Sequence, residues 1–246
     1  MGHDENYNLA VKYQLLADYY KYSDPQQHIH FYHMHIYHLQ KWVKTIKPIP
    51  SRDAPSSNPS QLRILHASPG IMAVDVHVNN NVVWKDLRYT NSSRYVDIKP
   101  TNNQIEVIQN GQKLITGTLQ ANSGINYTIA IAGTKDKLQL IPIGDDFTVP
   151  QSESKLRFWH LSPDAPSVDV AVKKGDVVFS DILYSGITDY LGLTPMTVDL
   201  EIRLAGTKDI VLPLNRVSLK PDVAYTIVAV GLVKNSPSLE AIFLAP

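Results

Sequence analysis

Two stretches of the chain decide the fold: LRILHASPGIMAVDVHV at residues 62–78 and LRFWHLSPDAPSVDVAV at residues 156–172. They share Leu, Arg, His, Ser, Pro, Val, Asp and Val in the same order, at an offset of 94 residues. The segments NYTIAIAG at 126–133 and AYTIVAVG at 224–231 recur in the same way. Similarity that extends this far along the chain indicates a duplicated domain.

Within each repeat the residue pattern predicts β-strands. Val74, Val76 and Val78 alternate with Asp75 and His77, which is the period of a strand with one buried face. The second copy has a similar alternation over 168–172. About seven short strands in roughly 90 residues, separated by turns that contain Asn or Gly, are typical of an immunoglobulin-like sandwich. The sequence therefore predicts a mainly β protein with two tandem immunoglobulin-like antiparallel β-sandwiches.

The first fifty residues have a different pattern, which predicts an N-terminal α-helical hairpin. Residues 9–22 and 28–46 have helical patterns, and between them Ser23 and Asp24 can cap the second helix, with Pro25 as its first residue. Proline- and serine-rich segments separate the parts of the chain. The predicted division is a hairpin at 1–50, a linker at 51–61, a sandwich at 62–149, a linker at 150–155 and a sandwich at 156–246.

The composition excludes several classes of function. Lys and Arg number 23, as do Asp and Glu, so no net charge attracts nucleic acid. The absence of cysteine excludes disulfides and thiolate chemistry. No apolar run approaches the roughly 20 residues of a membrane-spanning helix. The N-terminal residues 1–14 lack a basic start followed by an apolar stretch, so we expect cytoplasmic synthesis without a Sec signal.

Five of the nine histidines lie in HIHFYHMHIYH at 28–38. Pairs of histidines three residues apart on a helix could share a divalent metal such as zinc or nickel. The cluster contains no Asp or Glu to complete a site, so the alternative is an aromatic-rich face that packs or contacts a partner. No cofactor is required by the sequence, and the candidate metal ligands are His28, His30, His33, His35 and His38.

The same helix carries an apolar stripe with heptad spacing. Together with tyrosines of the first helix, this stripe predicts an interface through which residues 1–50 form a homo-oligomer or join other surface proteins. The predicted interface residues are Tyr19, Tyr20, Ile29, Tyr32, Ile36, Leu39 and Val43.

A motif with the pattern His-x-Ser-Pro occurs in both repeats, with an aspartate downstream. These residue types invite comparison with a catalytic triad, and a hydrolase that uses His160, Ser162 and Asp169 is the catalytic alternative. However, no G-x-S-x-G nucleophile segment accompanies either serine. We therefore predict a structural role and no enzymatic activity: the serine hydroxyls or Asp164 cap loop amides, and the imidazoles satisfy buried backbone groups. The motif residues are His66, Ser68, Pro69, Asp75, His160, Ser162, Pro163, Asp164 and Asp169.

The two copies of L-R-x-x-H-x-S-P-x-x-x-x-V-D-V resemble the repeats of the DUF4397 family of unknown function. The second copy, HLSPDAPSVDV at 160–170, has the family pattern, while the first departs from it at Gly70, Ile71 and Met72. The resemblance covers about 185 residues and implies tandem β-sandwiches of a bacterial envelope or secreted protein, with no catalytic residues to carry over.

Together these observations predict a non-enzymatic structural or adhesive protein of a bacterial cell or spore surface, including the spore coat or exosporium. In this prediction, the hairpin joins copies of the chain to one another or to other surface proteins. The alternative is a protein that binds a divalent metal or a small ligand through the His-rich helix.

Overall fold

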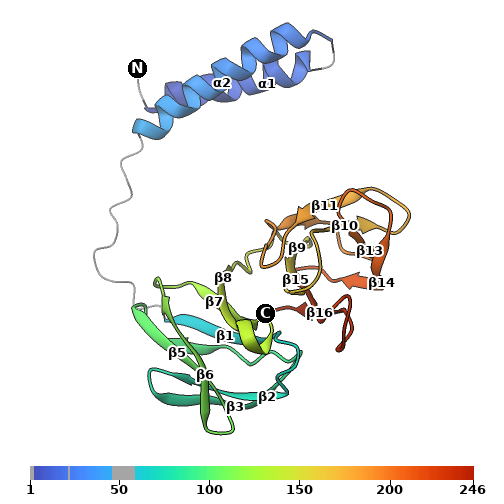
Figure 1. Cartoon of the computed structure of the whole chain (residues 1–246). Helices are drawn as coiled ribbons and strands as arrows, with labels where there is room; N and C mark the ends of the chain where they lie inside the picture. The colour runs from blue at the N-terminus through green and yellow to red at the C-terminus, as the bar shows by residue number, and fades with distance from the viewer. Residues whose placement is uncertain (1–2, 22, 46–58) are drawn as a thin grey trace. The chain divides into compact units, whose positions relative to one another are not determined.

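The computed structural model describes residues 3–21, 23–45 and 59–246. The chain divides into two compact units, residues 1–56 and 57–246. The first contains the helices α1 (His3–Tyr20) and α2 (Pro25–Thr45), which form a hairpin (Figure 1). Asp24 accepts hydrogen bonds from the backbone N–H groups of Gln26 and Gln27, both at 3.1 Å, and therefore caps α2. None of the described helices is long and apolar enough to cross a membrane.

The second unit contains the two repeats, each with eight strands. The strands of the first repeat are β1 (Ser60–His66), β2 (Ala73–Val78), β3 (Asn81–Arg88), β4 (Val96–Ile98), β5 (Asn102–Gln109), β6 (Gln112–Gln120), β7 (Asn126–Ala132) and β8 (Gln139–Asp145). Those of the second repeat are β9 (Ser154–His160), β10 (Val168–Val172), β11 (Val177–Ile182), β12 (Leu191–Leu193), β13 (Met196–Leu204), β14 (Ile210–Leu219), β15 (Val223–Val230) and β16 (Glu240–Leu244).

Each repeat forms two four-stranded sheets with the same topology. In the first repeat the sheet orders are β4-β1-β7-β8 and β3-β2-β5-β6, and in the second they are β12-β9-β15-β16 and β11-β10-β13-β14. The prediction of a mainly β chain with two sandwiches behind a helical hairpin is confirmed. The sheets are antiparallel except at two equivalent places, because β1 pairs in parallel with β7 and β9 pairs in parallel with β15.

Each sandwich has its own apolar core. The predicted alternation in β2 holds, since Val74, Val76 and Val78 are buried while Asp75 and His77 are partly exposed. The core of the second sandwich contains Val168, Val170 and Phe158, whereas Val172, the third valine of the predicted alternation, is 38% exposed. Its β10 differs from the pattern, because Asp169 and Ala171 on the outer side of this strand are also buried.

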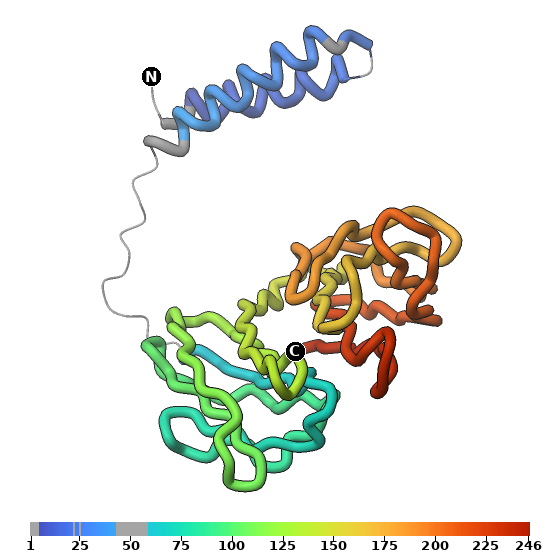
Figure 2. The backbone as a smooth tube through the Cα atoms, viewed as in Figure 1, coloured from blue at the N-terminus to red at the C-terminus, as the bar shows by residue number. Residues whose placement is uncertain are grey.

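A third apolar cluster joins the two repeats. Leu65 and Ala130 of the first repeat pack in one cluster with Trp159 and Val228 of the second, and all four are fully buried. These residues lie on the equivalent strands β1, β7, β9 and β15. The C-terminal end of the chain reaches back to the first repeat (Figure 2), where Arg63 donates to the carbonyl oxygen of Ala245 at 2.6 Å. The sandwiches therefore bury apolar surface against each other in addition to their own cores.

Candidate functional site

The imidazoles of the two His-x-Ser-Pro motifs are fully buried. The Nδ1 atom of His66 accepts from the backbone N–H of Ser68 at 3.4 Å, and that of His160 accepts from Ser162 at 3.3 Å. An Nδ1 that accepts places the proton on Nε2, which in His160 lies 3.2 Å from the carbonyl oxygen of Pro166. Each imidazole therefore closes the turn that follows its strand.

The serine hydroxyls and Asp164 are engaged with nearby loops. Ser68 Oγ donates to the carbonyl oxygen of Gly133 at 2.6 Å. Ser162 Oγ donates to Asp164 at 3.4 Å, and the Asp164 carboxylate accepts the backbone N–H groups of Val233 and Lys234 at 2.8 and 3.0 Å. Pro69 and Pro163 follow these serines, the first buried and the second partly exposed. These contacts fix the ends of the sandwich in each repeat.

The downstream aspartates bind backbone amides of neighbouring strands. Asp75 accepts from the N–H of Asp86 at 2.9 Å. Asp169 accepts from Asp181 at 2.7 Å and from Gly206 at 2.9 Å. The His and Asp side chains of the motif and Ser68 are thus bound to separate backbone groups, and Ser162 is bound to Asp164. A serine that donates to a carbonyl or to a capping carboxylate is not set up as a nucleophile.

A buried polar cluster lies between the repeats, and sequence reasoning did not identify it. Arg157 of the second repeat forms an ion pair with Asp145 of the first at 2.5 Å and donates to the carbonyl oxygen of Gly144 at 2.9 Å. The Asp145 carboxylate also accepts from Tyr95 at 2.7 Å and from Thr128 at 2.5 Å. Burial is the main cause that raises the pKa of the Tyr95 phenol, and Asp145 adds to it. The available signal was the Arg repeated in both copies.

The equivalent arginines make equivalent contacts. Arg63 stacks over Tyr95, with its guanidinium carbon 4.6 Å from the ring centre, and Arg157 stacks over Tyr190 at 4.4 Å. Arg63 reaches the carbonyl of Ala245 in the second repeat, as Arg157 reaches that of Gly144 in the first. Each repeat thus uses one arginine to hold the last strand of the other. The two arginines and Asp145 are buried at this contact between the sandwiches.

In the hairpin, three of the histidines and several aromatic residues form the seam between the helices. The Nδ1 atoms of His28 and His35 lie 2.8 and 2.9 Å from the carbonyl oxygens of Ala17 and Ala10. Buried His38 lies 3.1 Å from the Asn6 side chain. The contacts run in opposite directions along the two helices, so the helices are antiparallel. The ring of Phe31 stacks against those of Tyr13 and Tyr20 in the same seam.

The apolar side chains of the hairpin lie largely outside this seam. Tyr7, Val11, Leu15 and Tyr19 follow one another at four-residue intervals along α1, and their exposed fractions are 46, 42, 66 and 74%. On α2, Ile29 and Tyr32 are 54 and 46% exposed. We call these six residues the outer strips.

The remaining predicted interface residues are less exposed. Tyr20, Ile36 and Leu39 are partly buried, and the side chain of Val43 lies outside the described part of the chain.

The candidate metal ligands do not converge. His30 and His33 are exposed, while His28, His35 and His38 face α1. Among the side chains that the structure describes, no three or more His, Cys, Asp or Glu residues are grouped so as to hold a metal ion.

A model of the family described as "Domain of unknown function (DUF4397)" matches residues 60–171, which include both copies of the repeated motif. The predicted resemblance to this family is confirmed over these residues. No curated protein matches the chain.

Among solved structures, the Bacillus anthracis TIE protein matches with 8% identity and a TM-score of 0.23, over 70% of this chain and 33% of that protein. The chain therefore spans about a third of the length of that protein. A candidate cell adhesion protein from Bacteroides eggerthii matches with 8% identity and a TM-score of 0.24, over 77% of this chain and 96% of that one. Another from Bacteroides ovatus matches with 13% identity, a TM-score of 0.20 and the same shares.

Proposed function

A model of the DUF4397 family, whose description names no activity, matches residues 60–171, and on this premise we propose a non-enzymatic assembly protein of a bacterial surface. In this proposal the paired sandwiches form a rigid body, and the hairpin joins copies of the chain. The motif residues support the non-enzymatic part of this proposal, because the histidines, the aspartates and Ser68 are bound to backbone groups and Ser162 is bound to the Asp164 carboxylate. A surface location, including the spore coat or exosporium, rests on the resemblance to envelope proteins of the family.

The outer strips are the observation that carries the assembly proposal. Two helices of this length are marginally stable in water unless they bury an apolar face. The seam of this hairpin contains stacked aromatic rings as well as histidines, alanines and Asn6, but Leu15, Tyr19 and Ile29 outside it remain more than half exposed. Burial of such side chains stabilises by about 1.5–3 kcal/mol each. The hairpin therefore gains most if a second hairpin covers its outer strips.

A second copy of the chain fits this surface electrostatically. Within residues 1–45 the acidic residues are Asp4, Glu5, Asp18 and Asp24, and the basic ones are Lys12, Lys21, Lys41 and Lys44. Four charges of each sign cancel, so two hairpins meet without net repulsion at neutral pH. Antiparallel helix pairs commonly combine into four-helix bundles, and tyrosine is favoured in protein interfaces.

The test is the mass of the full-length protein in solution, measured by light scattering after size exclusion. We expect a multiple of the 27.5 kDa chain mass. The triple variant Leu15→Gln, Tyr19→Gln, Ile29→Gln should elute as a monomer with unchanged far-UV circular dichroism, since glutamine is a good helix former.

The matched control is Met72→Gln, which removes a side chain of the first sandwich that is 84% exposed. It should leave the oligomer intact. A monomeric wild-type chain at tens of micromolar, or an oligomer that survives the triple variant, rules out assembly through the hairpin. Immunogold labelling of intact cells and spores tests the location separately, and signal confined to the cytosol of vegetative cells contradicts it.

A further inference from the structure

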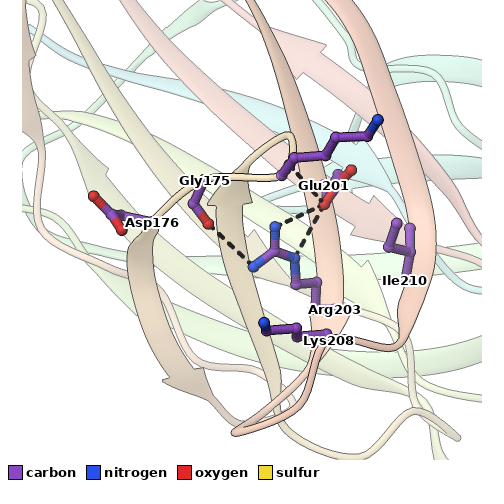
Figure 3. Close-up of a pocket in the computed structure, with 7 residues that line it drawn as sticks. Gly175, Asp176, Glu201, Arg203, Lys208 and Ile210 are labelled. Carbon is purple, nitrogen blue, oxygen red and sulfur yellow. Dashed lines mark hydrogen bonds and ion pairs between the residues drawn. The ribbon is translucent and has the colours of Figure 1, made fainter.

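The second sandwich carries a hollow on the outer side of the sheet β11-β10-β13-β14 (Figure 3). Its volume is about 550 Å³, which is within the usual range for sites that bind small molecules. Glu201 and Arg203 of β13 line it, together with the loop at 174–176 and with Lys208 and Ile210. None of these residues takes part in the hairpin, so the hollow is independent of the proposed assembly.

The floor of the hollow is a buried ion pair. The Arg203 Nε and Nη2 atoms both donate to Glu201 Oε2, at 3.1 and 2.8 Å. Arg203 also donates to the carbonyl oxygens of Gly175 at 3.3 Å and Val172 at 3.2 Å, which ties the β10–β11 turn to β13. Both charged residues are more than nine-tenths buried. The pair is therefore held in place before any ligand arrives, and one Glu201 oxygen remains as an acceptor.

The rim of the hollow has an excess of positive charge. The Arg203–Glu201 pair is neutral as a unit, and the remaining charged side chains are Lys174, Lys208 and Asp176. All three residues are exposed, which leaves one net positive charge around the opening. Ile210, 51% exposed, adds an apolar surface to the same hollow. The lining thus offers cationic donors, carboxylate acceptors and a small apolar wall.

Comparison of the two repeats shows that the duplicated framework alone does not produce this lining. The strand registers align Glu201 with Glu106 and Arg203 with Ile108. In the first repeat, Glu106 is paired instead with Lys113, at 2.5 Å. Lys174 corresponds to Asn80 at the repeat offset of 94 residues, and both have positive φ angles, of 58 and 64°. Asparagine tolerates a positive φ angle better than lysine does. The second repeat therefore has a lysine, Lys174, at a position whose backbone conformation disfavours it.

We propose that this hollow binds a carboxylate-bearing sugar, such as a hexuronate unit of a surface polysaccharide. The ammonium groups of Lys174 and Lys208 would receive the sugar carboxylate. Asp176 and the remaining oxygen of Glu201 would accept hydrogen bonds from hydroxyl groups, and a C–H face of the ring would pack on Ile210. A neutral sugar lacks the group that the lysines select, and inorganic phosphate lacks the hydroxyl pattern and the apolar face.

The test is saturation-transfer NMR on the full-length protein, with sodium glucuronate as the probe and glucose and inorganic phosphate as competitors. We expect saturable glucuronate binding with a Kd of about a millimolar, as is usual for a ligand of this size. Competition by glucose and by phosphate at the same concentration should be weak. Higher ionic strength should weaken glucuronate binding, since the rim charges are exposed.

Two variants locate the binding. Lys174→Asn, which copies the first repeat, and Lys208→Gln should each reduce glucuronate affinity at least about tenfold, which is the loss of one charged contact. The control Lys220→Gln removes an exposed lysine of the same repeat outside the hollow and should not change the affinity. Absence of saturable glucuronate binding, equal binding of glucose, displacement by phosphate alone, or unchanged affinity in both variants would each overturn the proposal. The oligomeric mass of the chain is a separate measurement, so either proposal can fail without the other.

Discussion

Arg157 of the second repeat and Asp145 of the first form an ion pair between the sandwiches, with a distance of 2.5 Å and side chains that are 6 and 1% exposed. Removal of one partner from a buried pair leaves an uncompensated charge away from water. The variant Asp145→Ala should therefore lower the free energy of unfolding by about 3–5 kcal/mol. Urea denaturation of the full-length chain measures this loss.

A neighbouring aspartate provides the matched control. Asp146 pairs with Lys155 at 2.6 Å, but its side chain is 64% exposed. Although the Lys155 side chain is only 9% exposed, Asp146→Asn should cost less than Asp145→Ala, about 1 kcal/mol, because the carboxylate lies in solvent and the asparagine oxygen can still accept from Lys155. The double variant Asp145→Leu, Arg157→Met should recover much of the stability lost in Asp145→Ala. Equal losses in Asp145→Ala and Asp146→Asn would show that the buried pair does not hold the repeats together.

The sequence predicted the duplication, the mainly β class and the helical hairpin because each has a periodic signal. The valines of β2 alternate with polar residues and so predict a strand, and Asp24 followed by Pro25 predicts the start of a helix. The ion pair had no such signal. Arg157 is visible as a repeated residue, but its partner Asp145 has no charged equivalent in the second repeat and lies in the other sandwich.

The hairpin seam and the hollow were missed for a related reason. Hydrophobic periodicity identifies apolar faces, whereas the surfaces that meet in this hairpin carry His28, His35 and Ala17. The apolar stripe found in the sequence does not coincide with this seam, because Ile29 is exposed while Ile36 and Leu39 are only partly buried. The hollow is lined by Arg203, a residue at which the two repeats differ. A search of the sequence for residues that both repeats share therefore does not find it.

The buried imidazole of His66 makes the stability of the sandwiches dependent on pH. Burial lowers the pKa of His66 to about 4 and also lowers the pKa of His160. In the unfolded chain the His66 imidazole takes up a proton near pH 6.5, so below that pH the unfolded state binds more protons. The free energy of unfolding should therefore fall as the pH drops from about 6.5 to about 4, by up to roughly 3 kcal/mol from His66.

Urea denaturation at pH 7.5, 5.5 and 4.5 measures this dependence on pH. The variant His66→Asn keeps an oxygen that can accept from Ser68 but cannot titrate, so its slope between pH 6.5 and 4 should be smaller than that of the wild type. A slope that is the same in both proteins would contradict the assignment to His66.

Substitutions at Ala17 and at Leu15 should affect the stability of the hairpin to different extents. Ala17 is fully buried in the hairpin seam, next to His28, whereas Leu15 is 66% exposed. Ala17→Leu inserts a larger side chain into the seam and should destabilise the hairpin by about 1–3 kcal/mol. At protein concentrations low enough to keep the chain monomeric, Leu15→Ala should leave helix formation almost unchanged, because the two residue types have similar helix propensities. Amide hydrogen exchange over residues 3–45 distinguishes them, and equal protection in both variants would place the seam elsewhere.

The His-rich helix should bind zinc or nickel only weakly. His28 and His35 use their Nδ1 atoms at the α1 backbone, which leaves one ring nitrogen each, and no carboxylate completes a group of three among the described side chains. Calorimetric titration of the full-length protein with zinc or nickel should show no saturable binding tighter than micromolar. A tight one-to-one complex that is lost in His28→Gln would instead favour the metal-binding alternative.

Substitution of Lys174 by asparagine should raise the stability of the protein and lower its affinity for glucuronate. Its φ angle of 58° lies in the left-handed region, where a lysine costs about 1 kcal/mol more than a residue suited to that conformation. Lys174→Asn places there the residue type that the first repeat has at Asn80, so it should raise the free energy of unfolding by about 0.5–1 kcal/mol. The same variant should weaken glucuronate binding, because it removes one ammonium group from the rim of the hollow. Thermal unfolding and saturation-transfer NMR on one protein sample measure both effects. A lysine retained for structural reasons alone would give the reverse pattern, with lower stability and unchanged binding.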